Sequence, residues 1–227
     1  MQIAIVILAA GKGTRMKSEM PKVLHEVAGA PLLMHCMKTA QTIEPEHLII
    51  VAGHGSEDVT KAAETYAPDS QIVTQSAQLG TAHAVAQSRE ILSGFEGDLI
   101  ILYGDTPFIR PETLKKLAQA RQKSDLVILG FEAKEPGHYG RLITSGTNLF
   151  EIVEYKEANA AQKDITLCNS GILAGPAELI FQLIEQVETS NNAGELYLTD
   201  CIALARAAGK SAGVVTCPEA ETLGVNS

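Results

Sequence analysis

The sequence predicts an α/β fold: a Rossmann-like, doubly wound sheet that is mostly parallel and covered by helices on both faces. Short continuous apolar runs alternate with longer amphipathic stretches, as expected of buried parallel strands joined by helices. The composition agrees, because 45% of the 227 residues are hydrophobic and only 4% are aromatic, which leaves a core of Ala, Val, Ile and Leu. After Phe131 the elements become more closely spaced, which indicates an antiparallel lobe in the second half.

Continuous apolar runs predict the strands of the first half, at Ile3–Leu8, Leu48–Val51, Ile72–Thr74, Leu99–Leu102 and Leu126–Phe131. Amphipathic stretches between them predict helices at Pro31–Ile43, Ser56–Tyr66, Thr81–Leu92 and Pro111–Lys123. Pro31 suits the first helical position and Ser56 suits a helix cap. Repeated strand–helix–strand units imply right-handed crossovers and a parallel sheet.

The second half begins with a predicted hairpin, in which YGRLI and LFEIVEY flank the turn TSGTN. A further strand is predicted at Leu167–Ala174, helices at Ala177–Glu188 and about Tyr197–Ala208, and a last strand at Ala212–Thr216. The sequence contains no internal repeat and no low-complexity segment. We therefore expect one continuous domain over residues 1–227.

The charge balance argues against DNA or RNA as a partner. The chain carries 18 Lys and Arg against 27 Asp and Glu, a net charge of −9, and no basic tract. A nucleic-acid backbone requires a cationic surface, whereas a single nucleotide needs only a few local cations.

The four cysteines are far apart and form no CxxC pair, which predicts reduced core thiols and no zinc site. The apolar run at the N-terminus is too short to span a membrane, and no cationic region precedes it. We expect a cytoplasmic protein without a membrane partner.

The stretch LAAGKGTRMKSEMPKVL follows the first predicted strand and matches neither common phosphate loop. Val6 stands where a Walker loop needs its leading glycine, and Met16 where a dinucleotide fingerprint needs its third. Gly11 still permits a tight turn whose N–H groups can meet anionic oxygens. Arg15 and Lys22 add two cations suited to a chain of phosphates. The alternative is a glycine turn with ordinary solvated cations.

Asp105 follows an apolar strand in LIILYGDTP. Ligands bind at the carboxyl ends of strands in such sheets, and Mg²⁺ prefers a carboxylate together with phosphate oxygens and water. Asp105 is therefore a candidate magnesium ligand facing a triphosphate. The alternative is that it only shapes the turn before Pro107.

The stretch TQSAQLGTAHAV is a candidate for base recognition. Gln75 can donate and accept hydrogen bonds at once, which fits a pyrimidine edge. Gly80 permits close approach of a planar base, and Thr81 can cap a helix. A polar loop with a capping Thr explains the same residues equally well.

The opening motif resembles the signature of the sugar-nucleotide nucleotidyltransferases, L-A-A-G-x-G-T-R-M followed by P-K. The stretches QLGTAHAV, LYGDTPFI, EPGHYGRL, IVEYKEA, NSGIL and GELYLTD stand in the order and spacing of one family. That family is the bifunctional N-acetylglucosamine-1-phosphate uridyltransferases/glucosamine-1-phosphate acetyltransferases. The likeness is to their uridyltransferase domain and runs from Ile3 to Asn226. It implies a fold of nucleotide-diphospho-sugar transferase type, with a nucleotide-binding half at 1–131 and a sugar-binding half at 132–227.

The resemblance also implies the site residues. It implies that Mg²⁺ is held by Asp105 and Asn226, and that Arg15, Lys22 and Asp105 are catalytic. The implied nucleotide site consists of Leu8, Ala9, Ala10, Gly11, Lys22, Gln75, Gly80 and Thr81. The implied sugar site consists of Tyr103, Gly104, Asp105, Gly140, Glu154, Asn169 and Asn226.

Several of these residues have simpler structural explanations. Gly140 suits a bulge, Glu154 an exposed strand charge and Asn169 a turn. Glu195 and Asp200 in GELYLTD are equally compatible with a structural role.

The implied reaction is transfer of UMP from UTP to N-acetyl-α-D-glucosamine 1-phosphate with release of pyrophosphate, for peptidoglycan and lipopolysaccharide precursor synthesis. The attacking phosphate is already ionised at neutral pH, so no general base is required. Two alternatives stay open: another nucleotidyltransferase, such as a cytidylyltransferase, and a non-catalytic nucleotide-sugar sensor on the same fold.

Full-length family members continue into a left-handed β-helix of hexapeptide repeats, which carries the acetyltransferase activity and forms a trimer. The present sequence ends at Ser227 without such repeats. We therefore expect no acetyl transfer, and a monomer is an open alternative to the trimer.

Overall fold

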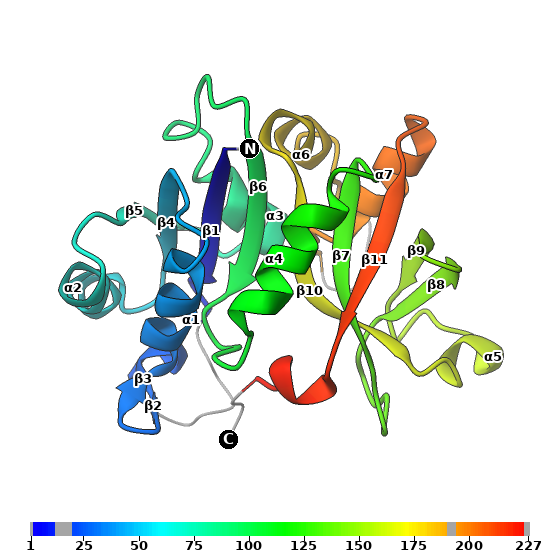
Figure 1. Cartoon of the computed structure of the whole chain (residues 1–227), viewed down its shortest axis with the longest axis horizontal. Coiled ribbons are helices and arrows are strands. Elements are labelled where there is room, and N and C mark those ends of the chain that lie inside the picture. Colours follow the sequence, from blue (N-terminus) through cyan, green and yellow to red (C-terminus); the bar gives the residue numbers. More distant parts are fainter. Residues whose placement is uncertain (1, 12–19, 190–193, 225–227) are drawn as a thin grey trace.

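The structure is a computed structural model that describes residues 2–11, 20–189 and 194–224. Within these ranges the chain forms a nine-stranded sheet in the order β5-β4-β1-β6-β10-β7-β11-β9-β8, with helices on both faces (Figure 1). The strands of the sheet are β1 (Ile3–Ala9), β4 (His47–Ala52), β5 (Gln71–Thr74), β6 (Asp98–Tyr103), β7 (Leu126–Glu132), β8 (Arg141–Ser145), β9 (Asn148–Val153), β10 (Leu167–Pro176) and β11 (Ala212–Cys217).

The sheet is mostly parallel, as the sequence predicts. Strands β5, β4, β1 and β6 pair in parallel, and so do β7 and β11. The predicted antiparallel part is present in the hairpin β8–β9 and in β10. Strand β10 lies antiparallel between β6 and β7, so both halves of the chain share one sheet.

Helices cover the sheet because each presents an apolar stripe to it. The helices α1 (Leu32–Gln41), α2 (Ser56–Tyr66) and α4 (Pro111–Ala120) bury residues in the core on one face. The helices α3 (Thr81–Ala86), α6 (Ala177–Ile184) and α7 (Asp200–Ala207) do so on the other. In α4, for example, Leu114 and Leu117 are buried while Lys115 is exposed.

Several helix boundaries differ from prediction. The helix predicted over Thr81–Leu92 ends at Ala86, because Ser88 donates both its N–H and its hydroxyl to the carbonyl of Val85 and the chain continues in turns. Pro31 precedes α1 as its N-cap and is not its first helical residue. The caps predicted for two other helices are also wrong, because glycines stand at the N-caps of α2 and α3.

Other predicted helices are shorter by one turn. The helix α4 ends at Ala120, α6 ends at Ile184 and α7 begins at Asp200. Several short elements were not predicted: β2 (Glu26–Val27), β3 (Ala30–Pro31), α5 (Ala160–Lys163), and the 3-10 helices η2 (Lys22–Leu24) and η3 (Glu219–Glu221).

All four cysteines are free and buried, as predicted. None of the helices in the described ranges is long and apolar enough to cross a membrane.

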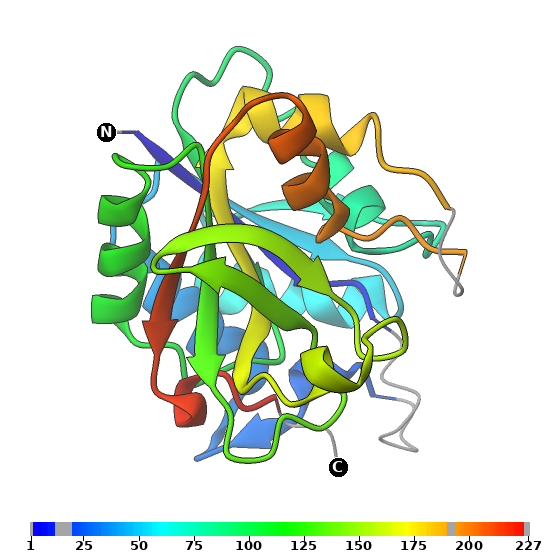
Figure 2. The ribbon, with the colours of Figure 1, turned by 90° about the vertical axis from the view of Figure 1, so that its right-hand side faces the viewer.

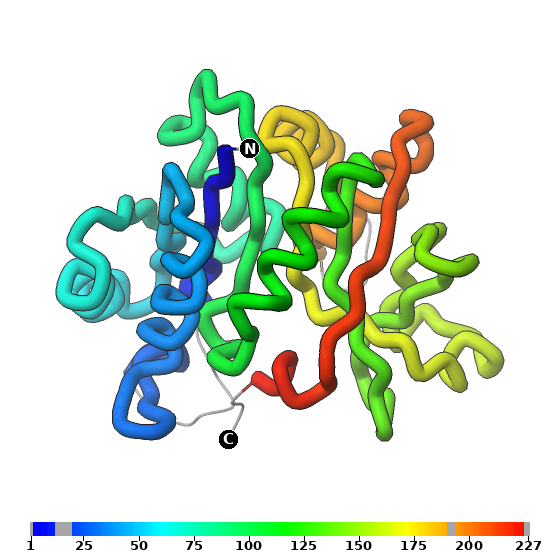
Figure 3. The backbone as a smooth tube through the Cα atoms, in the orientation of Figure 1, coloured from blue at the N-terminus to red at the C-terminus, as the bar shows by residue number. Residues whose placement is uncertain are grey.

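The path of the chain brings its last described residues back to the first half. Figure 3 shows the red segment after β11 running along the lower edge of the sheet towards the loop that follows β6. Strands β1 and β6 both end at this edge. The edge therefore collects loops from the beginning, middle and end of the sequence.

Candidate functional site

A pocket of about 280 Å³ opens at the carboxyl ends of β1 and β6. This is where ligands bind in open α/β sheets. It is lined by Leu8, Ala9, Ala10, Gly11, Lys22, Val23, Gln75, Gln78, Gly80, Thr81, Ala84, Tyr103, Asp105 and Glu195. The pocket thus brings together every residue that the sequence predicts for the nucleotide, and two of those predicted for the sugar.

The turn after β1 forms one wall of the pocket. The carbonyl oxygen of Ala10 accepts hydrogen bonds from the backbone N–H of His54 at 3.3 Å and from Nε2 of Gln78 at 2.7 Å. A side chain at Gly53 would collide with this turn, since its Cβ would lie 2.7 Å from Cβ of Ala10. The loops after β1, β4 and β5 are therefore held against one another.

Gln75 and Gly80, which the sequence predicts to face the base, form another part of the pocket wall. Gln75 is buried, and its Nε2 lies 3.0 Å from the carbonyl oxygen of Gly80 and 3.0 Å from Nδ1 of His83. Gly80 has a φ of +119°, and a Cβ there would lie 2.4 Å from the carbonyl oxygen of Leu196. Only glycine fits this close contact between two backbones.

Thr81 does not cap α3, contrary to prediction. It is the first residue of the helix, and its hydroxyl accepts a hydrogen bond from the backbone N–H of Leu198 at 2.9 Å. Ala82 donates its N–H to the carbonyl of Leu196 at 2.9 Å. These contacts tie the start of α3 to the segment before α7, so the segment that contains Glu195 becomes a wall of the pocket.

Lys22 and Asp105 form an ion pair at the pocket, with Nζ 2.5 Å from Oδ2. The Lys22 side chain is 12% exposed and that of Asp105 is 30% exposed. Lys22 opens η2 directly after the buried Pro21, whose ring packs so closely on Gly55 that a Cβ there would collide with it. A fixed cation and a partly exposed carboxylate at this edge suit a phosphorylated ligand.

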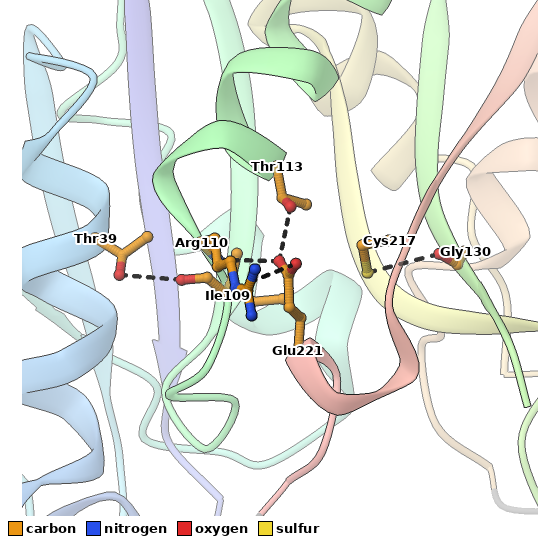
Figure 4. Close-up of polar contacts among 7 residues, drawn as sticks. All are labelled: Thr39, Ile109, Arg110, Thr113, Gly130, Cys217 and Glu221. Atoms are coloured by element: carbon orange, nitrogen blue, oxygen red, sulfur yellow. Dashed lines mark hydrogen bonds and ion pairs between the residues drawn. The ribbon is translucent and has the colours of Figure 1, made fainter.

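The loop that bears Asp105 is fastened at both ends. Gly104 donates its N–H to the carbonyl of Leu8 at 2.9 Å. Further along, the carbonyl oxygen of Ile109 accepts a hydrogen bond from Thr39 of α1 at 3.1 Å. A third contact involves η3 near the end of the chain: the Glu221 carboxylate accepts hydrogen bonds from the Arg110 N–H and the Thr113 hydroxyl at the start of α4 (Figure 4).

Tyr103 connects this pocket to the second half of the chain. Its ring lies against Gly171 of β10, where a Cβ would be 2.7 Å from Cε2 of the tyrosine. Burial, followed by the negative charge of Asp105, raises the pKa of Tyr103, which a hydrogen bond with the Thr81 side chain partly offsets. The ring, which lines the pocket and packs on β10, is therefore a neutral phenol.

Three further residues predicted for the sugar, Gly140, Glu154 and Asn169, lie close to one another. Gly140 accepts a hydrogen bond from the N–H of Asn169 at 2.9 Å, and a Cβ on Gly140 would be 3.4 Å from Oε1 of Glu154. Asn169 marks an irregularity in the pairing of β10 with β7, and its Oδ1 accepts from the N–H of Gly171 at 2.8 Å. Gly140, Glu154 and Asn169 therefore converge although they come from three segments.

Glu154 stands in an acidic neighbourhood. Burial raises its pKa, and the charges of Glu157 and Asp200 add to the shift. Burial also raises the pKa of Asp200, with a further contribution from Glu157. A carboxylate in such surroundings gains from hydrogen-bond donors such as sugar hydroxyls.

Two predicted residues, Arg15 and Asn226, lie outside the described residues. Among the residues that the structure describes, no group of three His, Cys, Asp or Glu could hold a metal ion. A magnesium ion bound by one or two carboxylates and by substrate phosphates does not need such a group, and Asp105 supplies a suitable oxygen donor.

Sequence reasoning missed four residues that line the pocket: Val23, Gln78, Ala84 and Glu195. Gln78 lies between Gln75 and Gly80, so its place in that motif could have identified it. Glu195 stands in GELYLTD, which the resemblance includes, but its position beside the start of α3 depends on contacts across the fold.

Comparison with known proteins shows the family to which the chain belongs. Residues 5–166 match the family model of the MobA-like NTP transferase domain. Over 227 residues the chain is 55% identical to the bifunctional protein GlmU of Ruegeria sp. (strain TM1040), covering 100% of this chain and 51% of that protein. It is 52% identical over 225 residues to the bifunctional protein GlmU of Cereibacter sphaeroides (strain ATCC 17025 / ATH 2.4.3), covering 99% of this chain and 50% of that protein. The chain spans about half the length of the curated relatives it matches.

Solved structures share the fold at lower sequence identity. A UDP-glucose pyrophosphorylase complexed with UDP-glucose aligns with a TM-score of 0.74 at 19% identity, over 95% of this chain and 91% of its own. The inositol-1-phosphate CTP transferase from T. maritima aligns with a TM-score of 0.76 at 17% identity, over 96% of this chain and 86% of its own. These two likenesses concern the fold alone.

Proposed function

The chain belongs to the MobA-like NTP transferase domain family, and from that membership we propose that it transfers UMP from UTP to N-acetyl-α-D-glucosamine 1-phosphate. The products are UDP-N-acetylglucosamine and pyrophosphate. The observation that carries the proposal is the ring of Tyr103, which lines the pocket around Lys22 and Asp105 and also packs on Gly171, whose N–H donates to Asn169. Identity to GlmU proteins along the whole chain supports the choice of substrates.

The nucleotide is assigned to the first half of the chain, residues 1–131. Gln75 donates from Nε2 to Gly80, while its Oε1 makes no hydrogen bond to any described residue. Oε1 can therefore accept the N3–H of uracil, a donor that cytosine lacks at that position. The close backbone at Gly80 and the turn from Leu8 to Gly11 leave a slot for the base and the ribose.

The phosphates are assigned to Lys22, Arg15 and Asp105. Lys22 is a half-buried cation, fixed by its ion pair with Asp105, that can neutralise an α-phosphate oxygen. We assign Arg15 to the departing pyrophosphate. We propose Mg²⁺ as the divalent metal, which when held by Asp105 and Asn226 would neutralise phosphate oxygens of both substrates.

The sugar phosphate is assigned to the second half, residues 132–227. Glu154 and Asn169 offer acceptors and a donor for hydroxyl and acetamido groups, and Gly140 leaves space beside the Glu154 carboxylate. Asp105, Tyr103 and Gly104 complete this side of the site.

The reaction is a direct displacement. An oxygen of the sugar phosphate forms a bond to the α-phosphorus of UTP while the bond from that phosphorus to the bridging oxygen breaks. The electron pair leaves with pyrophosphate. Since the nucleophile is already ionised, the task of the protein is to align two anions and neutralise their charge.

The experiment is pyrophosphate release from UTP, CTP or dTTP with several sugar 1-phosphates and Mg²⁺. We expect release with UTP and N-acetylglucosamine 1-phosphate and much less with any other pair. Preference for CTP would favour a cytidylyltransferase, and no release with any pair would favour a nucleotide-sugar sensor. Either result would overturn the proposal.

This activity would provide an activated amino sugar for peptidoglycan and lipopolysaccharide precursors, and we propose that it takes place in the cytoplasm.

A further inference from the structure

Arg141, the first residue of β8, is buried to 1% exposure. Its guanidinium donates to the carbonyl oxygen of Gly137 at 3.1 Å and to those of Pro136 and Lys163 at 3.3 Å each. It also donates to the carbonyl oxygen of Tyr139. In the described part of the chain, no carboxylate forms an ion pair with it.

Burying a cation without a countercharge is costly, so the contacts around it have to compensate. The planar guanidinium has five N–H donors in a fixed fork, and four carbonyl oxygens receive bonds from two of its nitrogens. A lysine at Arg141 could not replace this arrangement, because its ammonium is a single point with three donors. The side chain therefore fixes the backbone from Pro136 to Tyr139.

Two of the proposed sugar residues, Gly140 and Asn169, are directly connected to Arg141 or to the backbone that its guanidinium binds. Gly140 lies between Tyr139, whose carbonyl is bound, and Arg141 itself. Asn169 follows Cys168, which pairs with Arg141 where β8 meets β10. The hydrogen bond from Asn169 to the carbonyl of Gly140 joins the two.

The third sugar residue is attached through an aromatic ring. Glu154 precedes Tyr155, and the guanidinium carbon of Arg141 lies 5.7 Å from the centre of the Tyr155 ring. Nζ of Lys163 lies 4.9 Å from the same ring. The guanidinium also bonds the carbonyl of Lys163, so it holds the segment after β9 from both of its ends. Figure 2 shows the hairpin β8–β9 and α5 in front of the other strands of the sheet.

We propose that Arg141 is a positioning residue that sets the spacing of Gly140, Glu154 and Asn169 and thereby the affinity for the sugar 1-phosphate. It acts through the backbone and touches no substrate itself. The inference rests on the proposed function, because that function assigns the sugar to these three residues. The nucleotide pocket makes no contact with Arg141 and should not depend on it.

The test is the steady-state kinetics of Arg141→Lys, which keeps the charge and removes the fork. We expect KM for N-acetylglucosamine 1-phosphate to rise about tenfold or more, the loss that corresponds to one charge-assisted hydrogen bond. KM for UTP should stay within about twofold. Calorimetry should likewise show weaker binding of UDP-N-acetylglucosamine and unchanged binding of UDP.

Arg121→Lys is the matched control. Arg121 is also largely buried, with a side chain 15% exposed, and bonds Asp98 and the carbonyl of Ser124. It lies at the opposite end of β6 from the pocket, so its substitution should lower the thermal midpoint and leave both KM values unchanged. If Arg141→Lys raises both KM values equally, or neither, the proposal is wrong.

If Arg141→Lys does not fold, the same kinetics are measured on Tyr155→Leu, for which we expect a raised KM for the sugar phosphate. This substitution removes the ring beside the guanidinium, and an unchanged KM for the sugar phosphate would overturn the proposal. The wild-type chain separates the two claims. Without uridyl transfer by the wild type, the proposed function fails, whereas an active wild type with an unaltered Arg141→Lys contradicts only the role of Arg141.

Discussion

Replacing Glu221 by Ala should destabilise the fold at the edge that carries Asp105. Glu221 is only 3% exposed. Its Oε2 accepts hydrogen bonds from the Thr113 hydroxyl at 2.7 Å and from the backbone N–H of Arg110 at 3.1 Å (Figure 4). Thr113 is also buried, so its hydroxyl would lose its acceptor away from water. An unsatisfied buried hydroxyl costs about 1–3 kcal/mol. The lost carboxylate at the start of α4 adds about 0.5–1 kcal/mol.

We therefore expect Glu221→Ala to lower the free energy of unfolding by about 1.5–4 kcal/mol in urea denaturation. Glu219→Ala is the matched control: it lies in the same short helix, is half-buried and has weak contacts at 3.4 and 3.5 Å, so it should cost less than about 0.5 kcal/mol. Adding Thr113→Val to Glu221→Ala should recover part of the loss, since neither partner is then left alone. A Glu221→Ala chain within about 0.5 kcal/mol of wild type would refute this reasoning.

Three further predictions concern the site itself. Asp105→Asn should lower kcat by about 10²–10³, and it should also lower the unfolding midpoint because Lys22 loses its charged partner. Asp125→Asn, directly before β7 at the opposite end of the sheet, should leave kcat unchanged, and equal effects on kcat would contradict the assignment. Gly80→Ala should lower the free energy of unfolding by more than about 1 kcal/mol in urea denaturation and raise KM for UTP. The reason is that φ at Gly80 is +119° and the carbonyl oxygen of Leu196 blocks the new Cβ. An unchanged KM for UTP would count against this prediction. Burial raises the pKa of Glu154 above its ordinary 4.5, so the stability that Glu154 contributes is present below pH 4.5 and lost as pH rises through the raised value. Glu154→Gln should therefore be more stable than wild type at neutral pH yet bind the sugar phosphate less well. A Glu154→Gln variant less stable than wild type at neutral pH would argue against this.

Strands with both faces covered could be predicted well. In β1 and β6 the continuous apolar run is the strand itself, because helices cover both sides and no polar alternation interrupts it. The predicted ends of these two strands differ from the observed ones by at most one residue. Helix ends were harder to predict from the sequence. In α3, for example, the hydrogen bond from the Ser88 hydroxyl to the carbonyl of Val85 ends the helix before its apolar pattern ends.

The place of β10 could not be predicted from its own residues. It pairs with β6 on one side and β7 on the other, and both are apolar strands that a sequence pattern cannot tell apart as partners. This placement brings Gly171 against Tyr103, and so joins the two halves of the site. The contact belongs to the tertiary fold and has no local sequence pattern.

Arg141 was overlooked for a related reason. A charged residue at the start of a strand is ordinarily exposed, and EPGHYGRL drew attention to Gly140 alone. The burial of Arg141 follows only when the carbonyls of Pro136, Gly137 and Lys163 have come together around it. The nucleotide residues were easier because most of them lie in short contiguous motifs after strands.

The most direct test of the central claim is a crystal structure of the chain with UDP-N-acetylglucosamine and Mg²⁺. We predict uracil against Gln75 and Gly80, the diphosphate beside Lys22 and Asp105, and the amino sugar among Gly140, Glu154 and Asn169. A nucleotide bound outside this pocket, or a sugar on the nucleotide side of Tyr103, would contradict the account.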